Sequence, residues 1–349
     1  MSEEWSKKLN DLIEDLKKQK VCIIHHTDAD GVSAASVFCR VFNNYILHHQ
    51  KNEIKITEET ISFFRKTGLK YAVIVDLNVD AEEKTFRQLE KLCEKVIVLD
   101  HHIMNVDLSS EKTMHLNPLK EGFKEAEKYP ASKYAFDILG FKENDPVAWK
   151  VAVGLFGDKA LRYWKGFWEK VSKIWNLSIE DLKKISLTFD FSKAVSWDLF
   201  NKVRDIYISS KSPEDYLSKA YQIEELEKVK RKYTALRKKA LENAKLFNEF
   251  IVLFLEDCPE LKSLLANEVS ERYSDKTVVV LTRDKDNPAL LRISLRRQDR
   301  KYSMKELTRF MQRNLESFEG GGHIPAAGGK FLEKEMGKFM ECLKIFHKE

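Results

Sequence analysis

Hydrophobic positions in the first third of the chain alternate between short apolar runs and longer stretches with helical spacing. Three runs, at residues 21–26, 71–76 and 96–100, are apolar and end in polar residues, as buried parallel strands do. Amphipathic stretches at residues 4–19, about 32–48 and about 81–94 predict helices. This alternation of strand and helix predicts an α/β fold with a doubly wound parallel sheet.

The rest of the chain predicts a helical region, a connector and a smaller α/β domain. Residues 130–210 read as mainly helical and rich in aromatic side chains, which we interpret as core, with a partner-binding face or base-stacking platform as the alternative. From Glu214 to about residue 250 one long charged helix is expected. Strand-like runs follow at residues 250–254, 277–281 and 290–295. We therefore expect a catalytic metal-binding domain at 1–212, a helical connector at 213–249 and a substrate-binding domain at 250–349. The apolar stripe of the expected connector comprises Leu226, Val229, Tyr233, Leu236 and Ala240.

Composition narrows the class of protein. The 349 residues are 43% hydrophobic and 33% charged, with a net charge of +5, which fits two folded domains and permits a nucleic-acid partner. No apolar run approaches the roughly 18 residues that a membrane span needs, and the N-terminus does not resemble a signal peptide. The cysteines, five in number, form no CxxC pair. We therefore expect reduced cysteines, a cytoplasmic location and no membrane association.

Acidic and histidine residues follow each of the three predicted strands. The carboxyl ends of parallel strands meet in one crevice, where ligands bind. We therefore expect these residues to converge, although they are far apart in the sequence. They are His25, His26, Asp28 and Asp30 after the first strand, Asp76 at the end of the second, and Asp100, His101 and His102 at the end of the third.

Such a cluster predicts a metal site. Carboxylates crowded together repel one another unless cations neutralise them. Carboxylates mixed with imidazoles suit Mn²⁺ or another first-row ion better than Ca²⁺. Two such ions about 3.5–4 Å apart stabilise the attacking and leaving oxygens of a phosphoryl transfer. We expect two divalent ions, Mn²⁺ as the preferred species and Mg²⁺ or Co²⁺ as alternatives.

The motifs together resemble those of the DHH phosphoesterase family, whose Asp-His-His signature stands here at Asp100, His101 and His102. Residues 28–31 resemble the family's first motif, Asp76 the second, and residues 152–158 the fourth. By this resemblance Asp158, otherwise an unremarked end of a helix, is a metal ligand. The chain departs from the family pattern after the second motif, where Leu77 and Asn78 stand in place of the His and Gly that relatives often have. The identity of the first-motif histidine stays open, because His25 and His26 both fit.

A glycine-rich run near the C-terminus predicts an anion-binding loop. Residues 320–329 contain five glycines, whose backbone can approach a phosphate closely. The small residues after the first three glycines are expected to begin a helix whose N-terminus favours phosphate. Residues 282–313 carry ten Lys or Arg and four Asp or Glu, an excess that favours nucleic acid. The run Gly320, Gly321, Gly322 and His323 resembles the GGGH motif of the DHHA1 domain, and Ser294, Leu295 and Arg296 resemble the basic strand that precedes that motif.

The resemblance implies a mechanism and a role for each residue. His26, Asp28, Asp30, Asp76, His101 and Asp158 would hold the ions, with Asp76 as the bridge. Asp100 would orient a histidine, His102 would contact the scissile phosphate, and Arg296 with residues 320–323 would bind the substrate. The implied enzyme is a compact archaeal RecJ-like exonuclease. It would release nucleoside monophosphates from single-stranded DNA or RNA, in DNA repair, replication or RNA turnover, with a helicase or replication factor as an expected partner. The alternatives are a nano-RNase or cyclic dinucleotide phosphodiesterase, and an inactive DHH-fold scaffold.

Overall fold

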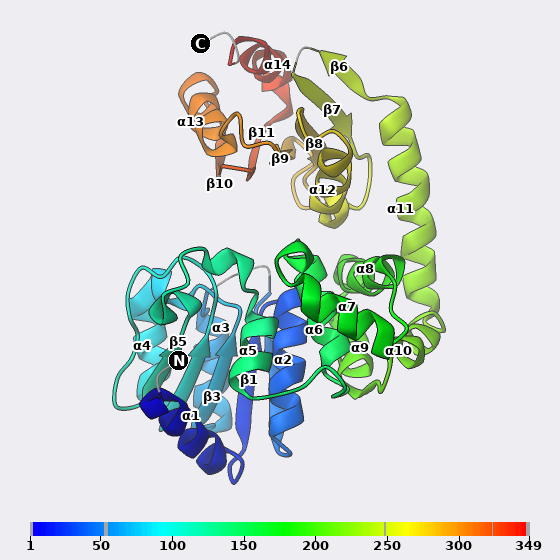
Figure 1. Ribbon diagram of the computed structural model, residues 1–349. Coiled ribbons are helices and arrows are strands. Elements are labelled where there is room, and N and C mark those ends of the chain that lie inside the picture. Colours follow the sequence, from blue (N-terminus) through cyan, green and yellow to red (C-terminus); the bar gives the residue numbers. More distant parts are fainter. Residues whose placement is uncertain (1–2, 52–54, 248, 323, 347–349) are drawn as a thin grey trace. The chain divides into compact units, whose positions relative to one another are not determined.

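The chain forms two compact units. The computed structural model describes residues 3–51, 55–247, 249–322 and 324–346 (Figure 1). Unit 1 comprises Met1–Phe189 and Asp198–Gln222, and unit 2 comprises Asp190–Trp197 and Ile223–Glu349. Each unit has its own sheet and its own hydrophobic core.

The sheet of unit 1 has five strands that all run parallel, in the order β2-β1-β3-β4-β5. The predicted α/β class with a doubly wound parallel sheet is confirmed. The three predicted strands are β1, β3 and β4, each within a residue or two of its expected bounds. The strands are β1 (Val21–His25), β2 (Tyr45–His49), β3 (Tyr71–Val75), β4 (Lys95–Leu99) and β5 (Thr113–Leu116).

Helices cover both faces of this sheet (Figure 1). Alternate strand residues such as Cys22, Ile24 and Ile74 pack on α3 (Glu58–Thr67) and α4 (Glu83–Leu92) to form one buried cluster. Helix α2 (Ala29–Val41) crosses from β1 to β2, in the opposite direction along the sheet from α3 and α4. Right-handed crossovers therefore place α2 on the other face. There α2 packs with α5 (Ala131–Ile138) and α6 (Ala148–Gly157).

The end of α2 corrects one prediction. A helix was expected from about residue 32 to 48, but α2 ends at Val41 and Tyr45–His49 forms β2. Phe42, which follows the helix, already has extended backbone angles. Strand β2 is a half-buried edge strand that pairs only with β1 among the described strands. Its side chains therefore lack the clean alternation of buried and exposed positions by which a strand is predicted. Strand β5, the other edge strand, was also missed.

The remaining helices of the first part of the chain hold the aromatic residues that were expected in a core. Trp149 and Phe200 are fully buried, and the Trp149 ring meets the Tyr207 ring edge-on at 5.1 Å. Among the described residues, no helix combines the length and apolar character that crossing a bilayer requires. The helices are α1 (Glu3–Leu16), α7 (Lys165–Ile174), α8 (Ile179–Val195), α9 (Trp197–Ser209) and α10 (Pro213–Ala220).

The expected long connector is two helices rather than one. Helix α10 ends at Ala220, and α11 (Glu224–Glu242) begins four residues later, in unit 2. Ile223, which precedes α11, has extended backbone angles, and the first turn of α11 carries Glu224, Glu225 and Glu227. Acidic residues stabilise a helix N-terminus, so this acidic cluster starts a new helix instead of continuing the old one. The predicted apolar stripe is largely correct, because Leu226, Val229, Tyr233 and Ala240 are buried.

Unit 2 is a six-stranded mixed sheet in the order β10-β11-β9-β8-β7-β6. Side chains from the sheet, including Leu291 and Phe331, form a core with Leu307, Met311 and Phe339 of the last two helices. Its strands are β6 (Lys245–Phe247), β7 (Phe250–Phe254), β8 (Thr277–Arg283), β9 (Leu290–Arg296), β10 (Glu319–Gly322) and β11 (Ala326–Leu332). Besides α11, its helices are α12 (Lys262–Arg272), α13 (Met304–Asn314) and α14 (Met336–Ile345).

Candidate metal centre

The turn between β1 and α2 brings the first group of acidic residues to the carboxyl edge of the sheet. Asp28 caps α2, and its Oδ1 accepts a hydrogen bond of 2.9 Å from the Gly31 amide. The turn is tight: a Cβ at Gly31 would lie 2.7 Å from both Cβ and the carbonyl oxygen of His26. Only glycine allows this close approach, which keeps His26 next to the N-terminus of α2.

The two consecutive histidines point to different places. His26 Nδ1 lies 2.8 Å from Asp28 Oδ2 and 3.5 Å from Asp76 Oδ2. His25, the last residue of β1, is fully buried and packs its ring near the Phe200 ring. Burial lowers the pKa of His25, whereas the Asp28 and Asp76 carboxylates raise the pKa of His26 well above its usual value although burial opposes the charge. The geometry therefore places His26, and not His25, among the acidic residues.

Asp30 is completely buried at the start of α2 and is held by the N-terminus of α5. Its Oδ2 accepts a hydrogen bond of 2.7 Å from the Ala131 amide, and its Oδ1 accepts bonds from the Ser132 amide and hydroxyl. Burial, followed by the Asp76 charge, raises the pKa of Asp30 to about 7. Neither Ala131 nor Ser132 belongs to a sequence motif, so no local pattern pointed to this support.

Asp76 lies at the centre of the cluster. It follows β3 with a left-handed backbone (φ 56°), which Asp tolerates better than most residues. Its Oδ1 is 3.3 Å from His101 Nε2. Its Oδ2 is buried and accepts no hydrogen bond from any residue that the structure describes. A buried carboxylate oxygen without a donor is costly, and a cation would satisfy it.

The Asp-His-His segment follows β4 and divides its side chains between two tasks. His101 Nε2 lies 3.3 Å from both Asp76 Oδ1 and Asp158 Oδ2. Asp100, almost fully buried, lies 2.7 Å from His102 Nδ1 and so fixes the His102 ring. The His102 side chain remains one-third exposed, which leaves its other ring nitrogen available to a ligand.

Asp158 reaches the cluster because helix α6 packs unusually close to its neighbours. Asp158 follows the last residue of α6. A Cβ at Gly154 would lie 2.3 Å from Ser132 Oγ and 2.6 Å from Asp30 Oδ1, and one at Gly157 would lie 2.8 Å from Ala29 Cβ. These two glycines let α6 approach α2 and α5. Burial, followed by the Asp30 charge, raises the pKa of Asp158 well above its usual value.

The side chains form adjoining groups that fit divalent ions. Within each group one ligand atom per residue lies within 4.8 Å of the others: His26, Asp28 and Asp76; Asp30, His101 and Asp158; and Asp76, His101 and His102. Asp76 and His101 each belong to two groups. Carboxylate oxygens combined with imidazole nitrogens suit a first-row ion such as Mn²⁺ better than Ca²⁺ or Mg²⁺, which prefer oxygen ligands. The donor set, together with the Asp76 oxygen that accepts no hydrogen bond from the described residues, therefore fits the expected divalent ions.

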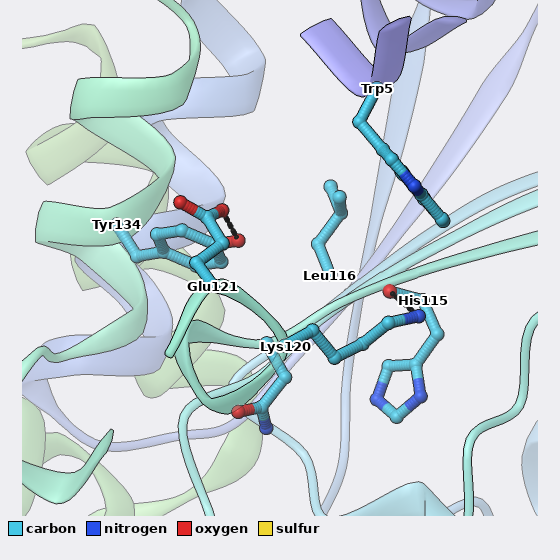
Figure 2. A pocket seen from close by; sticks show the side chains of 7 residues that line it. Trp5, His115, Leu116, Lys120, Glu121 and Tyr134 are labelled. Atoms are coloured by element: carbon cyan, nitrogen blue, oxygen red, sulfur yellow. Dashed lines mark hydrogen bonds between the residues drawn. The ribbon is translucent and has the colours of Figure 1, made fainter. Parts of the chain in front are cut away.

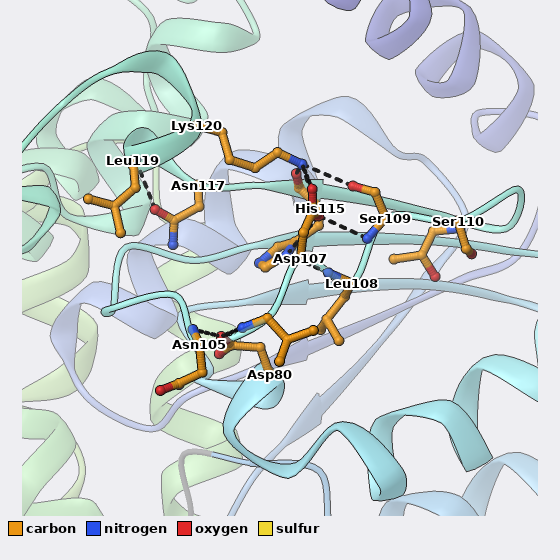
Figure 3. Close-up of polar contacts among 12 residues, drawn as sticks. Asp80, Asn105, Asp107, Leu108, Ser109, Ser110, His115, Asn117, Leu119 and Lys120 are labelled. Atoms are coloured by element: carbon orange, nitrogen blue, oxygen red, sulfur yellow. Dashed lines mark hydrogen bonds and ion pairs between the residues drawn. The ribbon is translucent and has the colours of Figure 1, made fainter.

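The loop after His102 is fixed by a residue that the sequence did not single out. Asp80 is 5% exposed, and its Oδ2 accepts hydrogen bonds from the amides of Asn105 and Val106 (Figure 3). Asn117 Nδ2 donates to the His102 carbonyl oxygen at 3.0 Å. The first two bonds fix the loop that follows the Asp-His-His segment, and the third fixes the backbone of His102 itself. The position of Asp80, four residues after Asp76, was visible in the sequence. A single acidic residue at such a position cannot be told from an ordinary surface residue, so the sequence alone did not reveal its role.

A small cavity of about 290 Å³ borders Asn117 and lies beneath Trp5 of α1 (Figure 2). Its polar side chains already have partners. Lys120 Nζ donates at 3.0 Å to Asp107 Oδ1, Ser109 Oγ and the His115 carbonyl oxygen, and the Tyr134 hydroxyl donates to Glu121. The polar groups of this cavity therefore stabilise the fold around β5 and do not call for a ligand.

The predicted substrate residues lie together in unit 2. Gly320, Gly321 and Gly322 form β10, which pairs with β11, and β11 pairs with β9, where Ala326 lies opposite Arg296. Arg296 Nε donates to Asn267 Oδ1 at 2.6 Å. His323 lies outside the described residues. The basic strand and the three glycines are thus one strand apart.

The helix expected after the glycines is absent, because Ala326–Leu332 forms strand β11. A Cβ at Gly320 would lie 2.5 Å from the Gly328 carbonyl oxygen, and one at Gly329 would lie 2.8 Å from the Glu319 carbonyl oxygen. The glycines therefore allow close packing of a strand pair. The expectation of a helix N-terminus that binds phosphate was wrong.

Comparison with known proteins agrees with this geometry. Residues 20–152 match the model described as the DHH family, N-terminal domain. This part of the chain is a DHH domain. The match covers β1 to β5 and the first residues of α6, and thus every proposed ligand of the DHH domain except Asp158. A search of the curated proteins finds no match to the chain.

Solved structures show the same fold over the chain. A protein described as a member of a family of ribosomal proteins, with a DHH domain, is 18% identical, with a TM-score of 0.71 over 98% of this chain and 91% of that one. A manganese-bound exonuclease RecJ is 17% identical, with a TM-score of 0.68 over 98% and 94%. RecJ of Thermus thermophilus with Mn²⁺ is 15% identical, with a TM-score of 0.67 over 98% and 54%. The chain therefore has a RecJ-like fold.

Proposed function

We propose that this DHH-domain protein is a two-metal, manganese-dependent phosphodiesterase that releases nucleoside monophosphates from an end of single-stranded DNA or RNA. The observation that carries the proposal is the convergence of carboxylates and imidazoles from three strand ends and from the end of α6, in groups that share Asp76 and His101. The manganese-bound RecJ with the same fold supports the choice of ion and reaction. A second RecJ structure, from Thermus thermophilus, holds Mg²⁺, so Mg²⁺ is the ion to compare.

Each residue has a defined task in this proposal. His26, Asp28 and Asp76 would hold one ion, and Asp30, His101 and Asp158 would hold the other, with Asp76 shared between the two. Such ions, when bound, stabilise charge on the phosphoryl oxygens and acidify a water to a nucleophile near neutral pH. Asp100 orients His102, whose exposed nitrogen contacts the scissile phosphate. The Ala131 and Ser132 amides hold Asp30 in place.

We assign nucleic-acid binding to unit 2. Strand β9 contributes Arg292 and Arg296, and β10 contributes the exposed backbone of residues 320–322. Exposed N–H groups and guanidinium groups are the usual partners of phosphate oxygens. Binding of a strand end by this region would make the enzyme an exonuclease, and the proposed roles in DNA repair, replication or RNA turnover depend on that.

Two alternatives have a specific observation behind them. A pGpG-specific phosphodiesterase, PggH of Vibrio cholerae, shares the fold with a TM-score of 0.56 at 11% identity, which favours an enzyme for very short substrates. CDC45 of Entamoeba histolytica shares it with a TM-score of 0.54 at 10% identity, so the fold also occurs in a protein that is not named as a nuclease or phosphodiesterase, and a scaffold stays the second alternative. The complete ligand groups argue against a scaffold, because a protein without a metal reaction gains nothing from burying uncompensated carboxylates.

The decisive experiment measures length dependence. The purified chain is incubated with end-labelled single-stranded DNA and RNA, from dinucleotides to oligomers several tens of nucleotides long, with Mn²⁺, Mg²⁺ or EDTA. We expect stepwise shortening of the long strands with Mn²⁺ and none with EDTA. Cleavage confined to the shortest oligomers would favour the alternative enzyme. The matched variants are Asp28→Ala/Asp30→Ala, which should be inactive, and Asp11→Asn on the exposed face of α1, which should be unchanged.

A further inference from the structure

A second, larger cavity in unit 1 lies at the ends of α2 and α6 that are remote from the metal centre. Its volume is about 660 Å³, and its lining includes Arg40 near the end of α2, Val147 and Lys150 at the start of α6, and Arg204 of α9. The acidic cluster lies at the opposite ends of the same two helices, where Asp30 and Asp158 stand. Ten residues of α2 separate Asp30 from Arg40, a helical rise of about 15 Å. The cavity is therefore distinct from the metal centre.

Positive charge dominates the cavity. Arg40, Lys150, Arg204 and Lys211 line it, and Asp205 is the one carboxylate in its described lining. Lys150 and Arg204 are only 5% and 6% exposed. Asp145, which is not part of the lining, pairs with Arg40 at 3.5 Å. Burying a cation is unfavourable unless an anion or polar partner accompanies it.

The buried cations are incompletely paired. Arg204 Nε donates to Asp205 Oδ1 at 2.9 Å and Arg204 Nη2 lies 2.9 Å from the same oxygen. Arg204 Nη1 is buried and has no hydrogen-bond acceptor among the described residues. Lys150 Nζ donates to the Ile208 carbonyl oxygen at 2.6 Å, which uses one of its three protons. The lysine of the smaller cavity differs, because Lys120 has three acceptors at 3.0 Å (Figure 3).

The rest of the lining fits an organic phosphate. Helix α6 begins beside the cavity, but its first amides already have acceptors: the Val147 amide donates to Asp145 Oδ1 at 3.0 Å and the Ala148 amide donates to the Asp145 carbonyl oxygen at 2.9 Å. Recognition of a phosphate group therefore falls to the cationic side chains. Tyr45 and Leu47 of β2 provide an apolar wall opposite these charges. A volume of about 660 Å³ falls in the range of about 300–1,000 Å³ typical of small-molecule sites.

We propose that this cavity binds the phosphate group of a small phosphate monoester, recognised by Lys150 and Arg204. The remainder of the ligand, a sugar or nucleoside, lies against Tyr45 and Leu47. The depth of the two cations favours a small molecule over an acidic segment of a partner protein, which would meet only the exposed Arg40 and Lys211. The proposal does not depend on the proposed nuclease activity.

The test is direct binding to the full chain in EDTA, so that phosphate cannot bind through ions at the metal centre. Inorganic phosphate, ribose 5-phosphate and adenosine monophosphate are titrated separately by isothermal calorimetry, with adenosine as the ligand that lacks phosphate. We expect saturable binding of one phosphate compound per chain and none of adenosine. Tighter binding of the monoesters than of inorganic phosphate would support the apolar contacts. Binding of an acidic peptide, but of none of the phosphates, would overturn the proposal.

Variants locate the site. Lys150→Met should weaken monoester binding at least tenfold, whereas Lys202→Met, an exposed lysine on α9 outside the cavity lining, should leave it unchanged. Circular dichroism and melting establish that each variant is folded. If Lys150→Met does not fold, the exposed double variant Arg40→Met/Lys211→Met should weaken binding at least threefold. Equal affinity in the wild type and in the folded cavity variants would contradict the assignment.

Discussion

The two ends of helices α2 and α6 carry opposite charges at comparable depth. At one end Asp30, Asp76 and His101 are buried together, and at the other Lys150 and Arg204 are buried in a cavity whose described lining contains one carboxylate, Asp205. Each end also has a buried side-chain atom with no hydrogen-bond partner among the described residues. This atom is Asp76 Oδ2 at the acidic end and Arg204 Nη1 at the basic end. Around Lys120, by contrast, charge and hydrogen bonds are balanced within the protein. The difference indicates that unbalanced buried charge marks a place for an ion of opposite sign.

The largest effect is expected from substitution of Gly154, which lies in α6 near the end that carries the metal centre. Gly154→Ala places a Cβ on Ser132 Oγ and Asp30 Oδ1, so α6 must move away from α5. Overpacking of this kind destabilises by about 1–3 kcal/mol. We expect Mn²⁺ affinity to fall as well, because outer-shell supports are each worth about 10–100-fold. Urea unfolding and Mn²⁺ titration measure the two effects.

Gly166→Ala is the matched control for that substitution. Gly166 lies in α7, and a Cβ there meets no atom within 4 Å. Alanine should therefore stabilise the helix by about 0.5–1 kcal/mol and leave Mn²⁺ affinity unchanged. Equal behaviour of the two alanine variants would show that close packing of α6 does not support the metal centre.

A smaller effect, dependent on pH, is expected at the basic end. Burial lowers the pKa of Lys150 from 10.5 to about 8. Between these pH values the folded protein binds fewer protons than the unfolded chain, so the contribution of Lys150 to the free energy of unfolding rises with pH. Replacing Lys150 by Met should therefore raise the free energy of unfolding most below pH 8. This gain in stability should shrink as the pH approaches 10.5.

The groups around Lys150 do not obscure this dependence. The neighbouring charges are those of Arg40, Asp145 and Asp215, and the Cys39 thiol, whose pKa burial raises to about 12, titrates above the window. Urea unfolding of Lys150→Met and Lys202→Met at a series of pH values is the measurement. A constant difference between wild type and Lys150→Met across the window would mean that Lys150 is not destabilised by burial.

The smallest effect on metal binding is expected outside both ends, at the loop after His102. Asp80→Ala removes the acceptor of the Asn105 and Val106 amides. A hydrogen bond to a charged group contributes about 1.5–3 kcal/mol, part of which solvent recovers in an exposed loop. We expect a modest loss of stability and phosphodiesterase activity with Mn²⁺ affinity unchanged. A loss of Mn²⁺ binding comparable to that of Gly154→Ala would extend the metal centre to this loop.

Local patterns predicted the central strands of unit 1 because these strands are apolar throughout and end in polar residues. Edge strand β2 was missed because its half-buried side chains give no period. Strand β5 was missed because it has only four residues and two of its three buried residues, Thr113 and His115, are polar. The choice between His25 and His26 could not be made from the sequence. The sequence does not tell at which residue β1 ends. Because successive residues of a strand point to opposite faces, a one-residue shift of that end would exchange the directions of the His25 and His26 side chains.

Other parts of the site depend on contacts between distant residues. Ser132 supports Asp30 across about a hundred positions of the sequence, and no local pattern records such a contact. The glycines at 320–329 suggested a loop and a helix because glycine often allows unusual backbone angles. Here Gly320 and Gly329 are needed for close strand packing, which depends on the partner strand. The cavity at Lys150 and Arg204 was likewise invisible, since its residues come from β2, α2, α6 and α9.

The central claim, a two-ion centre that shares Asp76, is tested most directly by counting bound Mn²⁺. Calorimetric titration gives the stoichiometry, and electron paramagnetic resonance detects magnetic coupling between neighbouring ions. The comparison is with Asp76→Asn, because Asn tolerates the left-handed backbone at this position and keeps the size of the side chain. We predict two coupled Mn²⁺ ions per wild-type chain, and loss of the coupling and of at least one ion in Asp76→Asn. A single uncoupled ion in the wild type, or two coupled ions in the variant, would contradict the account.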